Sequence, residues 1–415
     1  MLRKLLIVLF TAFLNAAYIN YIEEIPSGES GLYIYGKIYT DNDGVYTGQI
    51  RWGDEESFWF DHFNSSKPEN EYIDYLSKSE RRALSDDGDN VLSGFIRIGR
   101  NNSWSNSHTH QFACQFGHIK AIEIGRGDNV ELELKDGTKI DLEGGSNDIE
   151  TDVQINDVEI GHITIDWDDI ERVEFMSAPA SLNSYFGSPL YGTAELESGE
   201  QFTGFIQWDH DERLANDILN GETEDGDMEI KFGNIGKIEK ARRGSDVTTK
   251  SGRTMHLRGT NDVNDDNRGI IVNIPGSGRI DIPWDEFESV TFTEFSSIDI
   301  SYDDFKGHDG ISGTVITEGG DKHTGKIVYD LDETYLFEIL NGEHDDIEYS
   351  IPFQSIQTIK PISRKRTEVT LHDGTTVKLE NSVDVSDDND GILIFEGNND
   401  DPVYVPWEDV SEIKI

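Results

Sequence analysis

The fold of this chain is decided by one stretch, Glu200-Gln201-Phe202-Thr203-Gly204-Phe205-Ile206-Gln207-Trp208. Gly204, Ile206 and Trp208 stand at every second position, a spacing that is typical of a β-strand that buries one face. The same pattern recurs around Gly48 and Gly325. The sequence therefore predicts three diverged copies of one β-rich unit.

The copies stay in register beyond this strand. A second strand pattern follows in each copy, built on Phe116, Ile119 and Ile122, on Phe232, Ile235 and Ile238, and on Phe353, Ile356 and Ile359. Turn glycines flanked by alternating apolar residues then predict tight hairpins at Gly137, Gly252 and Gly374. We expect an all-β protein with tandem repeats at residues 31–175, 190–292 and 311–415.

Each repeat is expected to fold as a small antiparallel β-barrel or sheet, either as one body or as two sub-barrels. The Thr203-Gly204 strand and the acidic turn after it resemble the small SH3-like and Sm-like β-barrels. The resemblance covers about half of each repeat and implies the fold alone. Sm-like barrels bind RNA, and the charge of this chain argues against that function.

The composition excludes one class of partner. The 415 residues include 82 acidic and 35 basic side chains, which give a formal net charge of -47. Such a field repels nucleic acid and anionic membranes and favours cations and basic partners. A solvated acidic coat that keeps the protein soluble explains the same charge. We expect no nucleic-acid binding, and a protein or polysaccharide as the partner.

The first residues predict export. Arg3 and Lys4 precede an apolar run from Leu5 to Leu14, and small residues follow, which is the pattern of a signal peptide over residues 1–17. The run is too short to span a bilayer, and no later stretch approaches the ~20 apolar residues required. We expect a mature chain without a transmembrane segment, in the periplasm or outside the cell.

An insertion over residues 65–111 distinguishes the first repeat. An amphipathic pattern predicts a short helix over Glu71–Leu84. Residues that only this repeat has are candidates for a ligand-binding surface, and these are Trp59, Trp104, His108 and His110. We expect Trp59 and Trp104 to be exposed. Two imidazoles on one strand face can also bind zinc or copper, but no further ligand is spaced to complete such a site.

An acidic loop stands at the same place in all three repeats. Oxygen-bearing side chains alternate in it at a spacing of two and can converge on calcium. The candidate ligands are Asp148, Glu150 and Asp152, then Asp262, Asn264 and Asp266, and then Asp384, Ser386 and Asp388. None of the loops has the glycine and glutamate of an EF-hand. A turn in which these side chains cap their own backbone explains the same residues, and both interpretations stay open.

A pair of acids follows each Trp or Tyr strand end. The pairs are Glu56 with Asp61, Glu212 with Asp217, and Glu333 with Glu338. Two carboxylates can share the acid and base roles of a hydrolase when they face each other across a cleft. The sequence spacing fixes no such geometry, and enzymes seldom need three equivalent sites. A turn held by carboxylate-to-backbone hydrogen bonds is therefore favoured.

The regularly spaced aromatic residues are interpreted as core, with a stacking surface for sugars or peptides as the alternative. They are Trp52, Trp208 and Tyr329, and Trp167, Trp284 and Trp407. No phosphate loop, nucleophile elbow or dinucleotide fingerprint is present. We predict an exported binding or scaffold module that is not an enzyme. The alternatives are a carboxylate-based hydrolase, with its site in the first repeat or between repeats, and a calcium-stabilised structural protein.

Overall fold

The computed structural model confirms an all-β protein. Strands dominate the described residues, and their only α-helix is α1 (Lys78–Asp86). The structure describes residues 30–67, 71–86, 110–125, 127–144, 146, 148–180, 182, 184–295, 300–306, 309–397 and 401–415. The predicted signal peptide, residues 1–17, lies outside them. Within the described ranges, no helix has the length and apolar character needed to cross a membrane.

Residues 31–175, the first segment, form an eight-stranded antiparallel sheet with the order β7-β6-β5-β10-β1-β2-β8-β9. A separate hairpin is made of β3 (His62–Lys67) and β4 (His110–Gln115). The strands of the sheet are β1 (Tyr35–Thr40), β2 (Val45–Trp52), β5 (Ile119–Ile124), β6 (Asn129–Leu134), β7 (Lys139–Glu143), β8 (Val153–Asp157), β9 (Gly161–Ile165) and β10 (Ile170–Phe175).

Residues 190–292 and 311–415, the second and third segments, each contain ten strands. Those of the second are β11 (Tyr191–Leu196), β12 (Gln201–Trp208), β13 (Ile218–Thr223), β14 (Gly226–Lys231), β15 (Ile235–Ala241), β16 (Gly244–Thr249), β17 (Thr254–Leu257), β18 (Ile270–Ile274), β19 (Gly278–Ile282) and β20 (Phe287–Phe292). Those of the third are β21 (Ser312–Thr317), β22 (Lys322–Val328), β23 (Ile339–His344), β24 (Ile347–Pro352), β25 (Ile356–Ser363), β26 (Arg366–Leu371), β27 (Thr376–Glu380), β28 (Ile392–Phe395), β29 (Val403–Val405) and β30 (Val410–Lys414).

Strand pairings correspond between the segments. β1 pairs with β2 and β10, β11 with β12 and β20, and β21 with β22 and β30. The hairpins β8–β9, β18–β19 and β28–β29 also correspond, as do β3–β4, β13–β14 and β23–β24. Among the described strands no pairing joins the two ends of a sheet, so the sheets are open and no closed barrel is found.

The glycine of the Thr-Gly motif allows three strands to approach closely. Gly48 lies opposite Gly36 in the β1–β2 register, and a Cβ atom on Gly48 would clash with the carbonyl oxygen of Asn156 in β8. Gly204 would clash in the same way with the carbonyl oxygen of Asn273 in β18. Only glycine leaves room for a neighbouring backbone at such a position, which explains why the motif recurs.

Paired aromatic rings fill the cores of the segments, as predicted. Trp52, Trp208 and Tyr329 are at most 1% exposed, and Trp167, Trp284 and Trp407 at most 6%. Each ring of the first set meets one of the second nearly edge to face, at centroid distances of 6.0, 6.0 and 5.8 Å. This geometry is favourable for aromatic pairs. These six side chains are therefore core residues.

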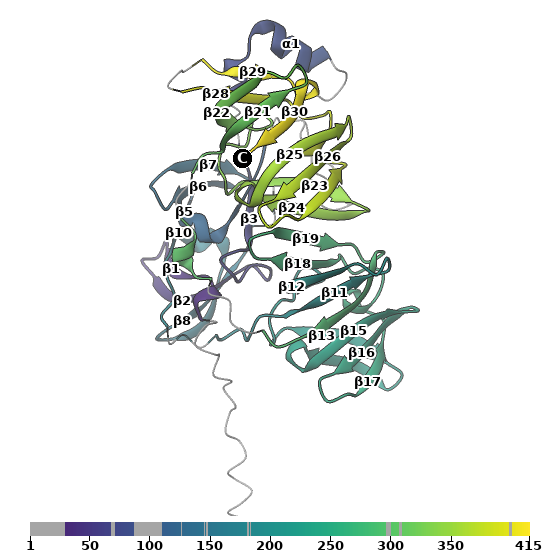
Figure 1. Ribbon diagram of the computed structural model, residues 1–415. Helices are drawn as coiled ribbons and strands as arrows, with labels where there is room; N and C mark the ends of the chain where they lie inside the picture. The colour runs from purple at the N-terminus through teal and green to yellow at the C-terminus, as the bar shows by residue number, and fades with distance from the viewer. Residues whose placement is uncertain are drawn as a thin grey trace, which may run out of the picture.

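The segments are joined in different ways. β19 of the second segment pairs with β24 of the third, so that their strands form one continuous sheet. Figure 1 shows these two strands side by side between the second and third segments, with α1 of the first segment at the far end of the third, near β28 and β29. Leu76, which precedes α1, is buried among Val328, Leu331 and Leu393 of the third segment.

The helix predicted over residues 71–84 is confirmed with shifted ends. A 3-10 turn covers Glu71–Tyr75, and α1 follows from Lys78. Ser77 and Glu80 cause the shift, because the Ser77 N–H donates to Glu80 Oε2 at 2.6 Å and the Glu80 N–H donates to Ser77 Oγ at 3.3 Å. This reciprocal pair is a capping box, which starts a helix. The α-helix therefore begins at Lys78 and not at Glu71.

Candidate functional site

The acids Asp61, Asp217 and Glu338 each close a turn in their own segment. Asp61 Oδ2 accepts the N–H groups of Ser57 at 2.8 Å and Phe58 at 2.7 Å. One oxygen of Asp217 and one of Glu338 accept two backbone N–H groups in the same way. The interpretation of these acids as carboxylate-to-backbone turns is therefore confirmed.

The other oxygen of Asp61 meets a cation from the second segment. Arg213 Nη2 lies 2.6 Å from Asp61 Oδ1, and the two side chains are only 1% and 2% exposed. Arg213 also donates to the carbonyl oxygen of Glu55 at 2.6 Å, and its guanidinium lies 4.7 Å from the centroid of the Phe58 ring. A buried charge requires such partners, because its transfer from water is costly.

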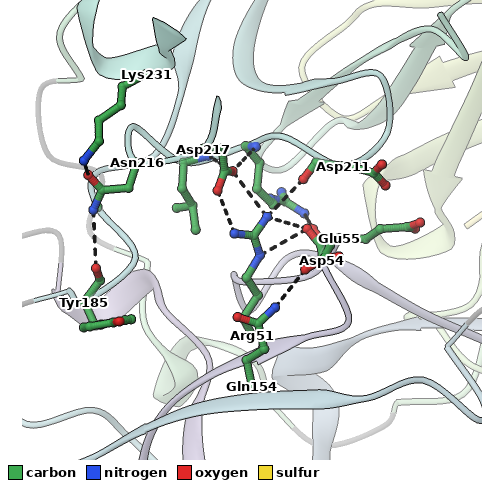
Figure 2. A network of polar contacts seen from close by, with 12 residues as sticks. Arg51, Asp54, Glu55, Gln154, Tyr185, Asp211, Asn216, Asp217 and Lys231 are labelled. Carbon is green, nitrogen blue, oxygen red and sulfur yellow. Dashed lines mark hydrogen bonds and ion pairs between the residues drawn. The ribbon is translucent and has the colours of Figure 1, made fainter. Parts of the chain in front are cut away.

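Asp217 receives the reciprocal cation from the first segment. Arg51 Nη1 lies 2.7 Å from Asp217 Oδ1, and Arg51 Nη2 lies 3.2 Å from Oδ2. Figure 2 shows Arg51 reaching from β2 to Asp217, with carbonyl groups of Asp54 and Asp211 around the same guanidinium. The first and second segments thus exchange an arginine in each direction.

Glu338 is bound by Lys67, at the end of β3 in the first segment. Lys67 Nζ lies 2.5 Å from Glu338 Oε1 and 3.2 Å from Asp332 Oδ1. Burial lowers the pKa of Lys67, but the carboxylates of Asp332 and Glu338 outweigh it and raise the pKa above its ordinary value. Equivalent acids in all three segments therefore hold a cation from a different segment.

The partner acids in the predicted pairs lie in a different environment. Burial, and next the charge of Asp262, raise the pKa of Glu212 to about 9. The pKa values of Glu56 and Glu333 are also raised well above the ordinary value, again chiefly by burial. A neutral carboxyl group has the property of a general acid. Its pair partner in each segment, however, is already bound by two N–H groups and a cation.

The first acid of each predicted calcium loop is a hydrogen-bond acceptor. Asp262 Oδ2 accepts the N–H of Asn220 at 2.6 Å and its side-chain amide at 3.1 Å, and Trp208 Nε1 donates to the Asp262 carbonyl at 2.8 Å. Asp148 has the same contacts with Asn64 and Trp52. Asp384 accepts the N–H of Asn341 at 2.6 Å, and its carbonyl accepts the Tyr329 hydroxyl.

The remaining loop residues form turns. The N–H of Asp266 donates to Asn264 Oδ1 at 2.8 Å, and the N–H of Asp388 donates to Ser386 Oγ at 3.3 Å. Glu150 and Asp152, the corresponding residues of the first loop, are exposed. In the described ranges no three His, Cys, Asp or Glu side chains converge on a point that could hold a metal ion.

Replacing Asp262 with alanine tests the two interpretations of the loops. We expect the free energy of unfolding to fall by about 1 to 3 kcal/mol, because the N–H of Asn220 loses its acceptor in a partly buried place. Urea unfolding measured with 1 mM calcium and again with a chelator should give the same loss. A loss that appears only with calcium would instead favour a cation site.

Of the four candidate ligand-binding residues of the first segment, the structure describes the side chain of Trp59 alone. Trp59 is fully buried, so the expectation that it is exposed is wrong. Its ring packs 4.5 Å from that of Tyr302, which lies in the connector between the second and third segments and covers it. Trp104 and His108 lie outside the described residues. His110 begins β4 opposite Lys67, and its side chain also lies outside the described part.

The edge of β9 is a feature that sequence reasoning missed. β9 ends its sheet, and no described strand pairs with its outer side. Its equivalent in the second segment, β19, pairs with β24 of the third. The opposite residues are Arg279 and Ser350, Ile280 and Tyr349, and Asp281 and Glu348. The same kind of edge is therefore covered in one segment and uncovered in another.

Equivalent residues show this difference in exposure. Ile280 is 7% exposed, whereas Ile163, at the same place in β9, is half-buried. A Cβ atom on Gly278 would lie 2.6 Å from the carbonyl oxygen of Ser350, whereas one on Gly161 would meet nothing within 4 Å. The space that β24 fills beside β19 is thus open beside β9.

A hollow of about 240 Å³ adjoins this edge. It lies between the β1–β2 hairpin and β9, and its lining includes Asn42, Tyr46, Ile163 and Asp166. The residue equivalent to Tyr46 in the second segment is Phe202, whose ring lies 6.4 Å from that of Tyr349 in β24. The hollow therefore corresponds to the place where the second segment receives an aromatic side chain.

The backbone of β9 presents hydrogen-bonding groups at this edge. The N–H of Val158 donates to the carbonyl of Thr47 in β2 at 2.9 Å. The backbone N–H and C=O groups of successive residues in a strand point to opposite sides. Those of Asn156 and Gln154 therefore also point toward β2. His162 and Thr164 lie opposite them in β9, so the N–H and C=O groups of these two residues point away from β8, toward the open side.

Comparisons with protein-family models, curated proteins and solved structures found no match to this chain. By its fold and site, this chain is an all-β protein in which the buried acids Asp61, Asp217 and Glu338 bind cations from neighbouring segments. The first segment also has a sheet edge, β9, with a hollow beside it.

Proposed function

We propose that this chain is an exported, non-enzymatic binding scaffold made of three copies of one β unit. The first copy receives an extended segment of a partner protein at the edge of β9. The observation that carries this proposal is the contrast between β9, which is open, and β19, which holds β24 in the same position. Export rests on the pattern of residues 1–17.

Contacts between segments support the role of a scaffold. Arg213, Arg51 and Lys67 bind the equivalent acids across the segment boundaries. An apolar cluster joins the first two segments as well, with Tyr33, Phe58 and Phe60 against Phe205 and Leu214. Such contacts favour a rigid body, in which a binding edge keeps a fixed position.

The same contacts support a role without catalysis. The hydrolase alternative needs a carboxylate that is free to accept a proton or attack a sugar. Asp217 is instead held by Arg51 and by the N–H groups of Arg213 and Leu214. Its pair partner Glu212 is buried at Oε2 without a hydrogen-bond partner among the described residues. One carboxylate of the pair is thus already engaged, which supports a structural role for the turn that Asp217 closes.

Strand addition explains how β9 would bind. An extended segment that pairs with a sheet edge gains main-chain hydrogen bonds, and pockets for alternate side chains give specificity. In β9 the outward groups of His162 and Thr164 supply the hydrogen bonds, and the hollow at Tyr46 and Ile163 receives an apolar side chain. The net charge of -47 repels an acidic partner at long range, so backbone pairing and the hollow supply the affinity for such a partner.

A peptide with the sequence of residues 346–352 is a suitable probe, because it contains the whole of β24, the strand that pairs with β19. Fluorescence anisotropy should show binding to the full chain with a Kd of roughly 10 μM to 1 mM. The His162→Pro variant should bind at least about tenfold more weakly, because proline removes the outward N–H. A proline also stands at the equivalent position of the third segment, Pro402.

His162→Ala is the matched control, since it keeps the N–H and should keep binding. The peptide itself offers a second control. Successive amides of a strand face opposite sides, so N-methylation at Ser350 and at Tyr349 should have unequal effects. Equal binding by the wild type and His162→Pro, at unchanged melting temperature, would refute strand addition at β9.

A polysaccharide is the second candidate partner, and the lining of the hollow favours it. Tyr46 supplies an aromatic ring, with Asn42 and Asp166 beside it, and sugar rings stack on such faces. Direct titration of the chain with oligosaccharides, followed by calorimetry, distinguishes the two. Oligosaccharide binding that survives His162→Pro and is lost in Tyr46→Ala would favour sugar binding.

A further inference from the structure

We propose that the segment received by β9 is strand β14 of a second copy of this chain. This inference rests on the proposed function, because it requires that β9 accepts a strand.

β14 is the counterpart of β24, the strand that already occupies the equivalent edge. Both are the second strand of a hairpin, β13–β14 and β23–β24. β14 pairs with β13 alone in the described part of the chain. Asp227 and Glu229 in it are exposed, and a Cβ atom on Gly226 would meet nothing within 4 Å. The outer side of β14 is therefore open to another strand.

The amides of β14 face the required direction. Glu222 in β13 exchanges backbone hydrogen bonds with Arg258, on the side away from β14, at 2.7 and 3.1 Å. Its opposite residue in the hairpin is Asp227. By the alternation of an antiparallel ladder, the N–H and C=O groups of Asp227 and Glu229 point away from β13. They can meet the outward groups of His162 and Thr164.

The register of β19–β24 predicts which side chains meet. Transferred to the new pair, it sets Glu229 opposite His162, Met228 opposite Ile163, and Asp227 opposite Thr164. Met228 then lies over the hollow beside Tyr46, where Tyr349 lies beside Phe202 in the second segment. A methionine sulfur is a favourable neighbour for an aromatic ring.

Charge at the junction also favours this pairing. Asp281 and Glu348 lie opposite each other in β19–β24. Burial raises the pKa of Glu348, and the charge of Asp281 raises it further. In the proposed pair Thr164 takes the place of Asp281, so no carboxylate faces another. His162 takes the place of Arg279 and lies opposite Glu229, so no like charges meet at this position either.

Other strands of a second copy are less available. β24 is occupied by β19, and β4 is covered by the third segment, since Phe112 contacts Phe337 and Gln115 contacts Gln354. At the remaining comparable edge, β29 follows Pro402, which lacks an N–H donor at the position of His162. Among these edge and hairpin strands, β9 and β14 are thus the acceptor and donor that keep both an open outer side and their outward N–H groups.

The predicted contact is heterologous, because one copy offers β9 and the other β14. Such contacts close into a ring or continue as a filament. The net charge of -47 on each copy opposes association. Salt screens this repulsion, with a Debye length of about 8 Å at 0.15 M, so association held by backbone pairing should strengthen as salt is added.

Sedimentation velocity of the full chain in 0.15 and 0.5 M salt tests the inference. We expect species larger than the monomer at high concentration, more of them at 0.5 M salt. His162→Pro and Glu229→Pro should each sediment as monomers. His162→Ala and Glu229→Ala keep the backbone donors and should associate like the wild type. Melting temperatures of the four variants check that each is folded.

Mixing the two proline variants gives the decisive result. His162→Pro keeps an intact β14 and Glu229→Pro keeps an intact β9, so an equimolar mixture should form a dimer that neither variant forms alone. A monomeric wild type at both salt concentrations, or association that survives both proline changes, would overturn this inference. If the peptide of residues 346–352 still binds, strand addition at β9 stands and only the second copy as partner is rejected.

Discussion

Replacing Arg213 with methionine should lower the free energy of unfolding by about 3 to 5 kcal/mol, because the change leaves the buried Asp61 carboxylate without its cation. Both side chains are almost inaccessible, and their closest N–O distance is 2.6 Å. Methionine keeps an unbranched apolar side chain beside Phe58, so the loss reports the ion pair together with the hydrogen bond to the Glu55 carbonyl. Urea unfolding followed by far-UV circular dichroism measures it.

Two further variants make this measurement specific. Arg268 pairs with Asp211 but is 44% exposed, so Arg268→Met should cost less than about 1 kcal/mol. Combining Arg213→Met with Asp61→Asn should recover part of the loss, because the asparagine carries no uncompensated charge. A cost for Arg213→Met equal to that for Arg268→Met would show that the buried pair does not hold the segments together.

Local patterns were sufficient to predict the strands. Gly204 and Trp208 belong to a pattern with period two that the chain repeats, and the structure places both in β12, beside β18 and in the core. The turns closed by Asp61 and Asp217 were also predicted, because a carboxylate after a strand end can accept N–H groups only a few residues away. These features depend on neighbours in sequence.

The contacts between segments depend on residues far apart in sequence, and the period of a strand carries no information about them. Trp59 is buried because Tyr302 covers it, and β9 is open because no strand comes to it as β24 comes to β19. One signal was available for the arginines. Arg213 aligns with Ser57 and Thr334, and Arg51 with Gln207 and Val328, so each charge is particular to one copy.

The stability of the chain should depend on Glu212 at alkaline pH. Its pKa is raised from 4.5 to about 9, mainly by burial, so the folded state keeps a proton that the unfolded state has lost. The stability from this group is complete below pH 4.5 and falls as the pH rises toward 9. Glu212→Gln removes this titration, so at pH 8.5 the free energy of unfolding of the variant should exceed that of the wild type by about 2 to 4 kcal/mol. This figure takes about 1.4 kcal/mol per pKa unit and is reduced because Glu212 is partly exposed.

The effect is taken as the difference between Glu212→Gln and the wild type at each pH from about 7 to 8.5, because burial lowers the pKa of Lys135 to about 8 and raises that of Glu348 to about 7, so these groups titrate in the same range. Burial lowers the pKa of His62 to about 3 and that of His118 to about 4, so their contributions change only below about pH 6.5, the ordinary value. Glu288→Gln is the matched control, since it removes one negative charge from an exposed position and should leave the pH dependence of the wild type unchanged. If Glu212→Gln destabilises the chain at pH 8.5, the buried carboxyl is needed as a charge, and its role as a neutral structural group is wrong.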